Sequence, residues 1–196
     1  PEAWETAVLQ TWELGAAIAT QYDAPGDPPS RDALADIAVE DAFAEPRIHR
    51  GLPGGIEELE AYRQEVVDGI HDHWVDPAAG KWEYTYHDRL VLNVHMRSND
   101  AFKAAFMNMY AFTDVQRVIA ERLSERVGRT ILPGQYNHIA DSFHIYGSYF
   151  DEFRAFLELV RNRSFERRTY RTDDVADLIE AARQAVIRSI EAERTQ

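Results

Sequence analysis

The chain has 196 residues, a formal net charge of −13 and no cysteine. This length predicts a single domain that buries about two-thirds of its unfolded surface, and the lack of cysteine excludes a disulfide scaffold and thiolate metal sites. The acidic balance argues against a nucleic-acid groove, which needs a basic face, and no apolar run approaches the roughly 20 residues of a membrane span. Because no signal-peptide pattern is found either, we expect a cytoplasmic protein.

The first half of the chain alternates helical and extended patterns. Residues 2–22 space their apolar side chains near a 3.6-residue period, which predicts a helix, and the stretch 23–30, rich in proline and glycine, predicts a loop. Residues 31–41 are compatible with a strand. The turn formers in 45–55 predict irregular backbone, and 57–69 predicts a helix that is closed by its terminal glycine.

In the second half, aromatic and β-branched residues dominate 81–96, which predicts one or two strands. Thr113 is expected to cap the start of a helix that ends at Gly128. Another strand region is expected over 136–150, and two amphipathic helices should follow, over 153–160 and 172–190. The mixed order predicts one domain with an α+β, or layered α/β, fold in which helices cover a mixed sheet.

An arginine, a serine and an aspartate lie close together in "RSND", residues 97–100. At a junction between a strand and a loop, Arg97 and Ser98 offer several donors to a phosphate, and Asp100 can accept from a base or fix the loop. A surface ion pair between Arg97 and Asp100 accounts for the same pattern without any ligand. Both interpretations stay open on the residues alone.

Three further side chains are candidates for binding a nucleotide. Asn108 lies in the apolar stretch "AAFMNMYAF" and carries a donor beside an acceptor, which suits the edge of a pyrimidine. A core amide with protein partners is the alternative, because a buried amide needs hydrogen bonds. His144 and Tyr146 are two residues apart, so on a strand they would face the same side and could bind one sugar hydroxyl, or pack together in the sheet.

No metal is expected. His71 and His73 could share a strand face, but no further ligand with suitable spacing follows them and the chain has no cysteine. The glycine-rich dinucleotide loop, the P-loop and the serine-hydrolase elbow are also missing from the sequence, so these classes of enzyme lack their usual signature.

Two segments, "RSNDAFKAAFMN" at 97–108 and "PGQYNHIADSFHIY" at 133–146, resemble the nucleotide-binding half of thymidylate synthases. The family pattern has Arg-Ser-x-Asp, an asparagine eleven residues after the arginine, and a later Pro-Gly with His-x-Tyr ten positions after the glycine, and this sequence meets both spacings. In an earlier segment Trp74 and Tyr86 resemble the family's tryptophan and tyrosine. The sequence "TYHDRL" is more similar to the archaeal-type branch of the family than to the common bacterial branch.

The resemblance implies that Arg97 and Ser98 hold the 5′-phosphate of a deoxynucleotide, with Arg97 also near the catalytic nucleophile, and that Asp100 orients the pyrimidine. Asn108 would pair with the N3 and O4 edge of the base. This favours uracil, because the related deoxycytidylate hydroxymethylases carry an aspartate at that position. Catalytic roles therefore fall to Arg97, Asn108 and Tyr86. Of these, Tyr86 would lie near the proton that is removed from C5.

The remaining implied contacts concern the sugar and a water. His144 and Tyr146 would bind the 3′-hydroxyl of the deoxyribose. Glu58 and Glu60 are candidates for the family's glutamate that organises water at the base.

The implied function is a thymidylate-synthase-type methyl transfer. A one-carbon unit would pass from methylene-tetrahydrofolate, or a related pterin, to C5 of dUMP and be reduced there, giving dTMP without a metal. The implied assembly is a homodimer whose sheets stack back to back. The alternatives are a pyrimidine nucleotide hydroxymethylase, in which water completes the reaction, and a cysteine-less nucleotide-binding protein without catalysis.

One departure from the family is large. Its reaction begins when a cysteine thiolate adds to C6 of the pyrimidine, and this chain has no cysteine. About sixty residues of the family pattern are missing between Leu90 and Val91, which would remove a central strand and expose sheet edges. Either a deletion left a nucleotide-binding relic or a non-covalent enzyme, or the sequence is part of a longer chain, which is the interpretation we favour.

Overall fold

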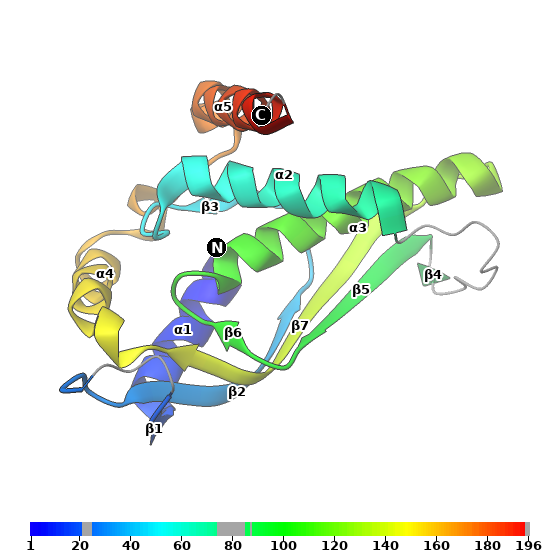
Figure 1. Ribbon diagram of the computed structural model, residues 1–196. Helices are drawn as coiled ribbons and strands as arrows, with labels where there is room; N and C mark the ends of the chain where they lie inside the picture. Colours follow the sequence, from blue (N-terminus) through cyan, green and yellow to red (C-terminus); the bar gives the residue numbers. More distant parts are fainter. Residues whose placement is uncertain (21–24, 74–84, 87, 195–196) are drawn as a thin grey trace.

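The computed structural model describes residues 1–20, 25–73, 85–86 and 88–194. Figure 1 shows a twisted main sheet with long helices stacked on it, and a second sheet consists of two short strands. The helices are α1 (Glu2–Leu14), α2 (Gly55–His73), α3 (Ala105–Val127), α4 (Phe150–Asn162) and α5 (Ala176–Arg194), with short 3-10 turns at Gly147–Tyr149, Phe165–Arg167 and Asp173–Val175. The strands are β1 (Ala16–Ile18), β2 (Ser30–Val39), β3 (Ile48–His49), β4 (Thr85–Tyr86), β5 (Arg89–Met96), β6 (Asn99–Asp100), β7 (Leu132–Ile145) and β8 (Thr169–Tyr170).

The main sheet is mixed, with the strand order β1-β2-β7-β5-β4 and with β6 also paired to β7. The pairs β1–β2, β2–β7 and β4–β5 are antiparallel, whereas β5 and β6 run parallel to β7. The parallel pairing requires a crossover, and α3 supplies it between β6 and β7. Helices packed on a mixed sheet confirm the predicted α+β fold class.

The helices form successive layers on one side of the sheet. α1 and α3 lie directly on it, with α1 against β2 and β7 and with α3 against β5 and β7. α2 packs on α3, and α5 packs on α2 (Figure 1). None of the described helices is long and apolar enough to cross a membrane.

The opposite face of the sheet carries polar side chains. On this face Asn137 donates to the Asn93 side chain at 2.6 Å, and His95 lies 2.7 Å from Asp141. Leu34 of β2 is 73% exposed. Along β7 the alternate residues Tyr136, His138 and Ala140 are buried, so the period-two pattern of this strand separates a covered face from an open one.

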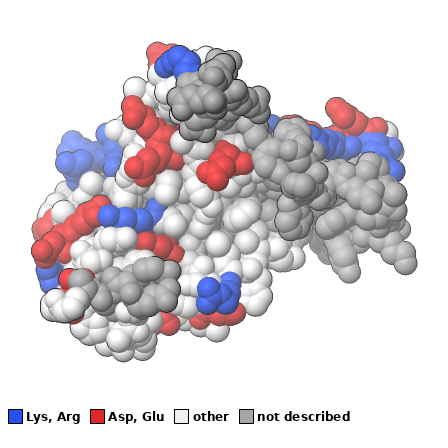
Figure 2. All heavy atoms as spheres, in the orientation of Figure 1, with Lys and Arg blue, Asp and Glu red and all other residues white. Residues whose placement is uncertain are grey.

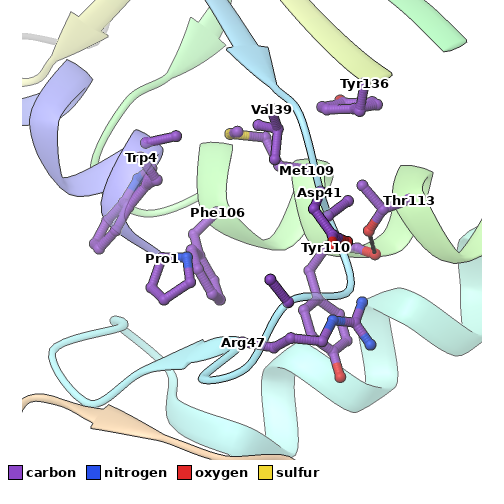
Figure 3. Close-up of a pocket in the computed structure, with 13 residues that line it drawn as sticks. Pro1, Trp4, Val39, Asp41, Arg47, Phe106, Met109, Tyr110, Thr113 and Tyr136 are labelled. Atoms are coloured by element: carbon purple, nitrogen blue, oxygen red, sulfur yellow. Dashed lines mark hydrogen bonds between the residues drawn. The ribbon is translucent and has the colours of Figure 1, made fainter. Parts of the chain in front are cut away.

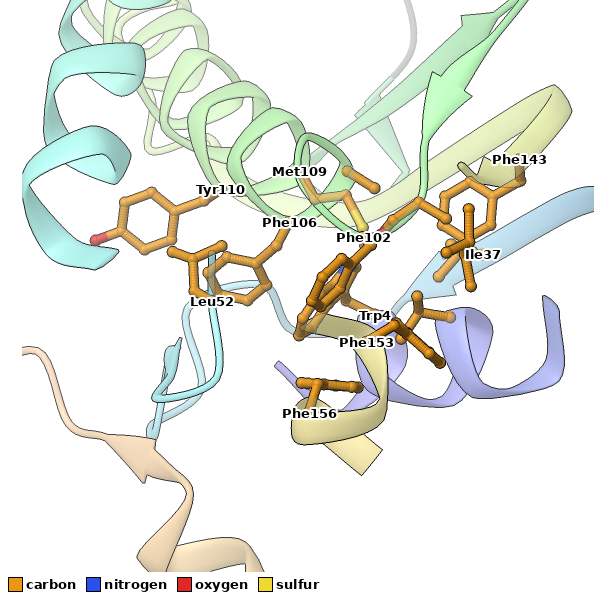
Figure 4. Packing of buried hydrophobic residues seen from close by; sticks show 14 of the residues in the cluster. Trp4, Ile37, Leu52, Phe102, Phe106, Met109, Tyr110, Phe143, Phe153 and Phe156 are labelled. Carbon is orange, nitrogen blue, oxygen red and sulfur yellow. The ribbon is translucent and has the colours of Figure 1, made fainter. Parts of the chain in front are cut away.

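The core is built largely from aromatic side chains that α1, α3 and α4 bring together (Figure 4). Trp4 is 1% exposed and packs edge-on against Phe106 and Phe156, with ring centroids 5.3 and 5.4 Å away. Its indole N–H donates to the backbone oxygen of Ala101 at 2.8 Å. A buried indole needs such a partner, and this bond also fixes the turn between β6 and α3 against the start of the chain.

A buried carboxylate ties the first helix to β3 and to a segment near the other end of the chain. Glu5 accepts two hydrogen bonds from the Arg168 guanidinium, at 2.6 and 2.7 Å, and one from His49 Nε2 at 2.9 Å. Burial alone would raise the pKa of Glu5, but the bonds from Arg168 and His49 outweigh it and hold the pKa below its ordinary value. The Gly51 N–H donates to His49 Nδ1 at 3.0 Å, so the neutral ring carries its proton on the nitrogen that faces Glu5.

β5 passes through Leu90 and Val91 as one strand, with a register shift against β7 between Leu90 and Leu92. The side chain of Gln116 of α3 contacts the backbone at this register shift. Its buried Nε2 lies within hydrogen-bond distance of the backbone oxygens of Leu90, Gly134 and Gln135, at 2.7, 3.1 and 3.2 Å. The family segment expected at the junction between Leu90 and Val91 stays a prediction.

Several predicted helices have different ends in the structure: those predicted over 153–160 and 172–190 are α4 (Phe150–Asn162) and α5 (Ala176–Arg194). The helix predicted over 2–22 stops at Leu14, because Gly15 is extended and the following strand β1 pairs with β2. The helix predicted over 57–69 starts at Gly55 and continues past Gly69 to His73, so that glycine does not close it. His71 and His73 therefore belong to a helix and not to a strand.

The start of α3 was also predicted wrongly. Thr113 lies in the middle of the helix, where its hydroxyl donates to the Tyr110 backbone oxygen at 2.8 Å, and the helix begins at Ala105. The run before Thr113 is buried and apolar, which favours continuing the helix over capping it. The predicted end is confirmed, since Gly128 adopts the left-handed conformation with φ of 68°.

Candidate functional site

Arg97 and Ser98 form the link between the end of β5 and β6. The Arg97 side chain is exposed and makes no hydrogen bond or ion pair with another described residue. The surface ion pair with Asp100, one of the two interpretations of the sequence, is therefore not found between these side chains. An exposed guanidinium with unused donors is able to bind an oxyanion.

Asp100 holds the turn into α3. One of its carboxylate oxygens accepts the backbone N–H groups of Phe102 and Lys103, at 3.0 and 2.9 Å. Burial raises the pKa of Asp100 in spite of these bonds. Through its backbone, Asp100 pairs with His144 in the sheet, so the "RSND" segment and the His-x-Tyr segment lie side by side.

His144 is 5% exposed near the end of β7. Its Nδ1 lies 3.3 Å from the Ser142 hydroxyl, and its buried Nε2 has no hydrogen-bond partner within the described chain. The rings of His144 and Tyr146 are in contact, with centroids 4.5 Å apart. A buried ring nitrogen without a partner is costly, and a ligand hydroxyl would satisfy it.

Asn108 lies in the first turns of α3, 5% exposed, and its amide is held on both sides. The Tyr62 hydroxyl of α2 donates to Asn108 Oδ1, and Asn108 Nδ2 donates to Asn99 Oδ1 at 2.9 Å. Asn99 Nδ2 in turn lies 2.8 Å from His138 Nε2, and His138 Nδ1 lies 2.8 Å from the Tyr136 hydroxyl. We name this set the polar chain: Tyr62, Asn108, Asn99, His138 and Tyr136.

The polar chain runs through the interior beside β6 and β7. Tyr136 and His138 are both fully buried. Burial lowers the pKa of His138 to about 4 and raises the pKa of Tyr136, so both groups are uncharged near neutral pH. Because Asn99 presents its amide N–H to His138 Nε2, the neutral ring carries its proton on Nδ1 and donates it to the Tyr136 oxygen.

The structure therefore places the segments that carry most of the predicted nucleotide contacts next to one another. Asp100 and His144 are paired, Arg97 and Ser98 precede them directly, and Asn108 reaches the same segment through Asn99. Sequence reasoning missed four members of the polar chain. Asn99 lies inside the quoted "RSND", and Tyr136 and His138 occupy buried alternate positions of β7. No sequence signal connects Tyr62 with Asn108.

Tyr86 is placed differently. The backbone of Tyr86 belongs to β4 and pairs with Arg89 at the start of β5, whereas Arg97 follows the end of that strand. At roughly 3.3 Å per residue the two positions are separated by most of the strand's length. The Tyr86 side chain and Trp74 lie outside the described residues, and the catalytic role of Tyr86 stays a prediction.

The two candidate glutamates differ in their surroundings. Glu58 is exposed. Glu60 is 2% exposed and its carboxylate is occupied by arginines, with two bonds from Arg63 at 2.6 and 2.7 Å and one from Arg183 at 3.2 Å. These bonds join α2 to α5, and Arg63 also reaches Asp114 of α3 at 3.1 Å. The surroundings of Glu60 are those of a structural ion pair.

A separate hollow lies between the start of α1, the loop after β2 and α3 (Figure 3). Its wall includes Trp4, Phe106, Met109 and Tyr136. Arg47 lies over the Tyr110 ring, with its guanidinium carbon 4.4 Å from the ring centroid. On the surface seen in Figure 2, basic and acidic side chains are interspersed and form no continuous basic stripe.

Similarity to known proteins is found in structure and not in sequence. No family model and no curated protein matches the chain. Among solved structures it is similar to the thermostable thymidylate synthase A from Bacillus subtilis, with a TM-score of 0.54 and 13% identity, over 80% of this chain and 83% of that one. The chain therefore has a thymidylate-synthase-like fold. Within the described residues no group of side chains suited to a metal is found.

Proposed function

We propose that the chain binds a dUMP-type pyrimidine nucleotide where β5, β6 and β7 end. The observation that carries this proposal is the pairing of Asp100 with His144, because it brings the link that carries the exposed Arg97 guanidinium beside the end of β7, which carries the unpartnered His144 Nε2. Arg97 and Ser98 would hold the phosphate, and His144 with Tyr146 would bind the sugar hydroxyl. Asn108 would read the base.

The reaction class that we propose for this site is a thymidylate-synthase-type methyl transfer to C5 of dUMP. Asn108 as an amide favours uracil over the cytosine that a hydroxymethylase would take. The implied one-carbon donor is a methylene-tetrahydrofolate-like pterin. Among the described residues at the site, the unpartnered Nε2 of His144, whose ring contacts Tyr146, suits a hydroxyl. No recognisable site for a pterin is formed by these residues.

The composition favours a second candidate, a nucleotide-binding protein without turnover. The family's chemistry needs a thiolate that adds to C6 of the base, and the printed sequence contains no cysteine. No other side chain at the proposed site is an equivalent nucleophile. Phosphate, sugar and base contacts could all persist without that group.

Replacing Arg97 with alanine is expected to weaken dUMP binding about ten- to a hundredfold, because a charge-assisted hydrogen bond contributes roughly 1.5 to 3 kcal/mol. Isothermal titration calorimetry measures the effect. Arg154→Ala is the matched control, since Arg154 lies on α4 and its exposed side chain pairs with Asp151. Equal affinity of Arg97→Ala and the unaltered chain, or no dUMP binding at millimolar nucleotide, would contradict the proposed site.

Turnover separates the two candidates. The test is tritium release from C5-labelled dUMP in the presence of methylene-tetrahydrofolate, on protein whose intact mass matches the 196-residue sequence. Release would support the enzyme and show that the cysteine is dispensable. Retained dUMP binding without release would support the non-catalytic protein.

We also propose that the chain forms a homodimer through the open face of the main sheet. Leu34 is 73% exposed there, and the hydrogen-bonded amides of Asn93 and Asn137 lie on the same face. A sheet with one uncovered face is a natural surface for association with a second copy, because a self-complementary patch closes a two-fold interface.

A further inference from the structure

The amide of Asn108 is only half used by its protein partners. An asparagine amide has two N–H donors and an oxygen with two lone pairs. Tyr62 takes one lone pair, and Asn99 takes one N–H at 2.9 Å. The other N–H faces the sulfur of Met96 at 3.9 Å, a weak acceptor. One lone pair of Oδ1 therefore remains without a protein partner, and the second N–H has only this weak one.

We propose that Tyr62, Asn99 and His138 determine which pyrimidine the site accepts, by fixing the direction in which the Asn108 amide points. This inference rests on the proposed nucleotide site. The free acceptor and donor of Asn108 match the N3–H and O4 of uracil. Cytosine has an acceptor at N3 and a donor at C4, so it would require the amide to be turned around.

Turning the amide around is opposed along the whole polar chain. Asn108 Oδ1 would then face Asn99 Oδ1, which has no proton to donate. Relief would require the Asn99 amide to flip as well, and its oxygen would meet His138 Nε2, which carries no proton in the observed arrangement. His138 would have to move its proton from Nδ1 to Nε2, and the Tyr136 hydroxyl would have to turn from acceptor to donor. The base is held in place by its phosphate and sugar, so it cannot compensate by turning over.

Taking up a second proton would give His138 a donor at Nε2 without moving the proton from Nδ1, but this does not occur near neutral pH. His138 is fully buried, and its pKa of about 4 keeps the ring neutral at physiological pH. A protonated ring would donate from both nitrogens, so its Nε2–H would require the oxygen of the Asn99 amide, and not its N–H, to face it. A neutral ring with one donor and one acceptor transmits a single direction to Asn99 and from there to Asn108.

The test compares the affinities for dUMP and dCMP in matched variants by calorimetry. The unaltered chain is expected to prefer dUMP by about ten- to a hundredfold, the range of a bidentate amide pairing with the correct base over the wrong one. Asn99→Ala frees the amide to rotate, and its preference should fall to within about threefold of unity. Asn99→Asp offers only acceptors, so one oxygen should hold Asn108 Nδ2 in the same direction and keep the dUMP preference, while His138 moves its proton to Nε2 and donates it to the other oxygen.

The control is Asn162→Ala, at the end of α4, where the exposed side chain donates to Glu158 at 2.9 Å. Its preference should equal that of the unaltered chain. A purely structural role for Asn99 would lower both affinities by the same factor and leave the ratio unchanged, which would overturn the inference. If Asn99→Ala does not fold, Tyr62→Phe takes its place, since loss of the donor to Asn108 Oδ1 should also reduce the ratio.

The outcome also separates this inference from the proposed function. A chain that binds neither nucleotide refutes the site itself. A chain that prefers dUMP equally well with and without the Asn99 side chain keeps the site and refutes the role of the polar chain. A preference for dCMP in the unaltered chain would contradict the direction assigned to the Asn108 amide.

Discussion

Glu5→Gln is expected to lower the free energy of unfolding by about 3 to 5 kcal/mol, the cost of removing one partner of a buried ion pair. Glu5 is 6% exposed and accepts bonds from Arg168 and His49. The neutral amide would leave the Arg168 guanidinium, whose side chain is 15% exposed, without its carboxylate. Urea denaturation followed by tryptophan fluorescence measures the change.

Glu13→Gln provides the matched control on the same helix, because Glu13 is exposed and its replacement should change stability by less than about 0.5 kcal/mol. The double variant Glu5→Gln with Arg168→Gln should be less damaging than the sum of the two single variants, since the second change removes the unpaired charge. Additive losses would show that the pair is not coupled. A loss below about 1 kcal/mol for Glu5→Gln alone would contradict the buried ion pair.

Acidification from pH 7 to pH 5 is expected to cost the unaltered chain about 2 kcal/mol of stability through His138 alone. The pKa of His138 is lowered from 6.5 to about 4 by burial. The unfolded chain therefore takes up a proton below pH 6.5 that the folded chain refuses until about pH 4, so this stability is complete above pH 6.5 and is lost as the pH falls. Unfolding free energies at both pH values give the slope.

His138→Gln isolates this contribution, because glutamine keeps a donor and an acceptor but does not titrate. The variant should lose about 2 kcal/mol less than the unaltered chain over the same pH interval. The lowered pKa of His49 acts in the same direction, but His49 is present in both proteins and cancels from the comparison. Parallel pH profiles would mean that His138 is accessible to protons in the folded state.

The sequence pattern predicted the elements whose signals are local. The strand over 31–41 and the helix end at Gly128 are confirmed by β2 and by the left-handed glycine. Helix starts were less predictable. A threonine at position 113 resembles a cap, but the burial of the apolar run before it decides the matter, and burial depends on what packs against that run.

In the candidate site too, local features could be predicted from the sequence and features that depend on distant residues could not. The spacing from Arg97 to Asn108 was sufficient to predict that these residues belong to one candidate site. In the structure, the pairing of Asp100 with His144 brings the second segment, 133–146, beside the first. The partners that orient Asn108 could not be predicted. Tyr62 and His138 are far from it in the sequence, and a tyrosine or histidine at such positions is equally compatible with simple packing.

In the proposed site, the polar chain would make base recognition a property of the protein interior. Asn108 cannot be exchanged for another reading group without disturbing Asn99 and, through it, His138. Substitutions at these positions should therefore show strong epistasis, and a lineage that changed its preferred base would be expected to carry compensating replacements in β6 and β7 alongside the one in α3.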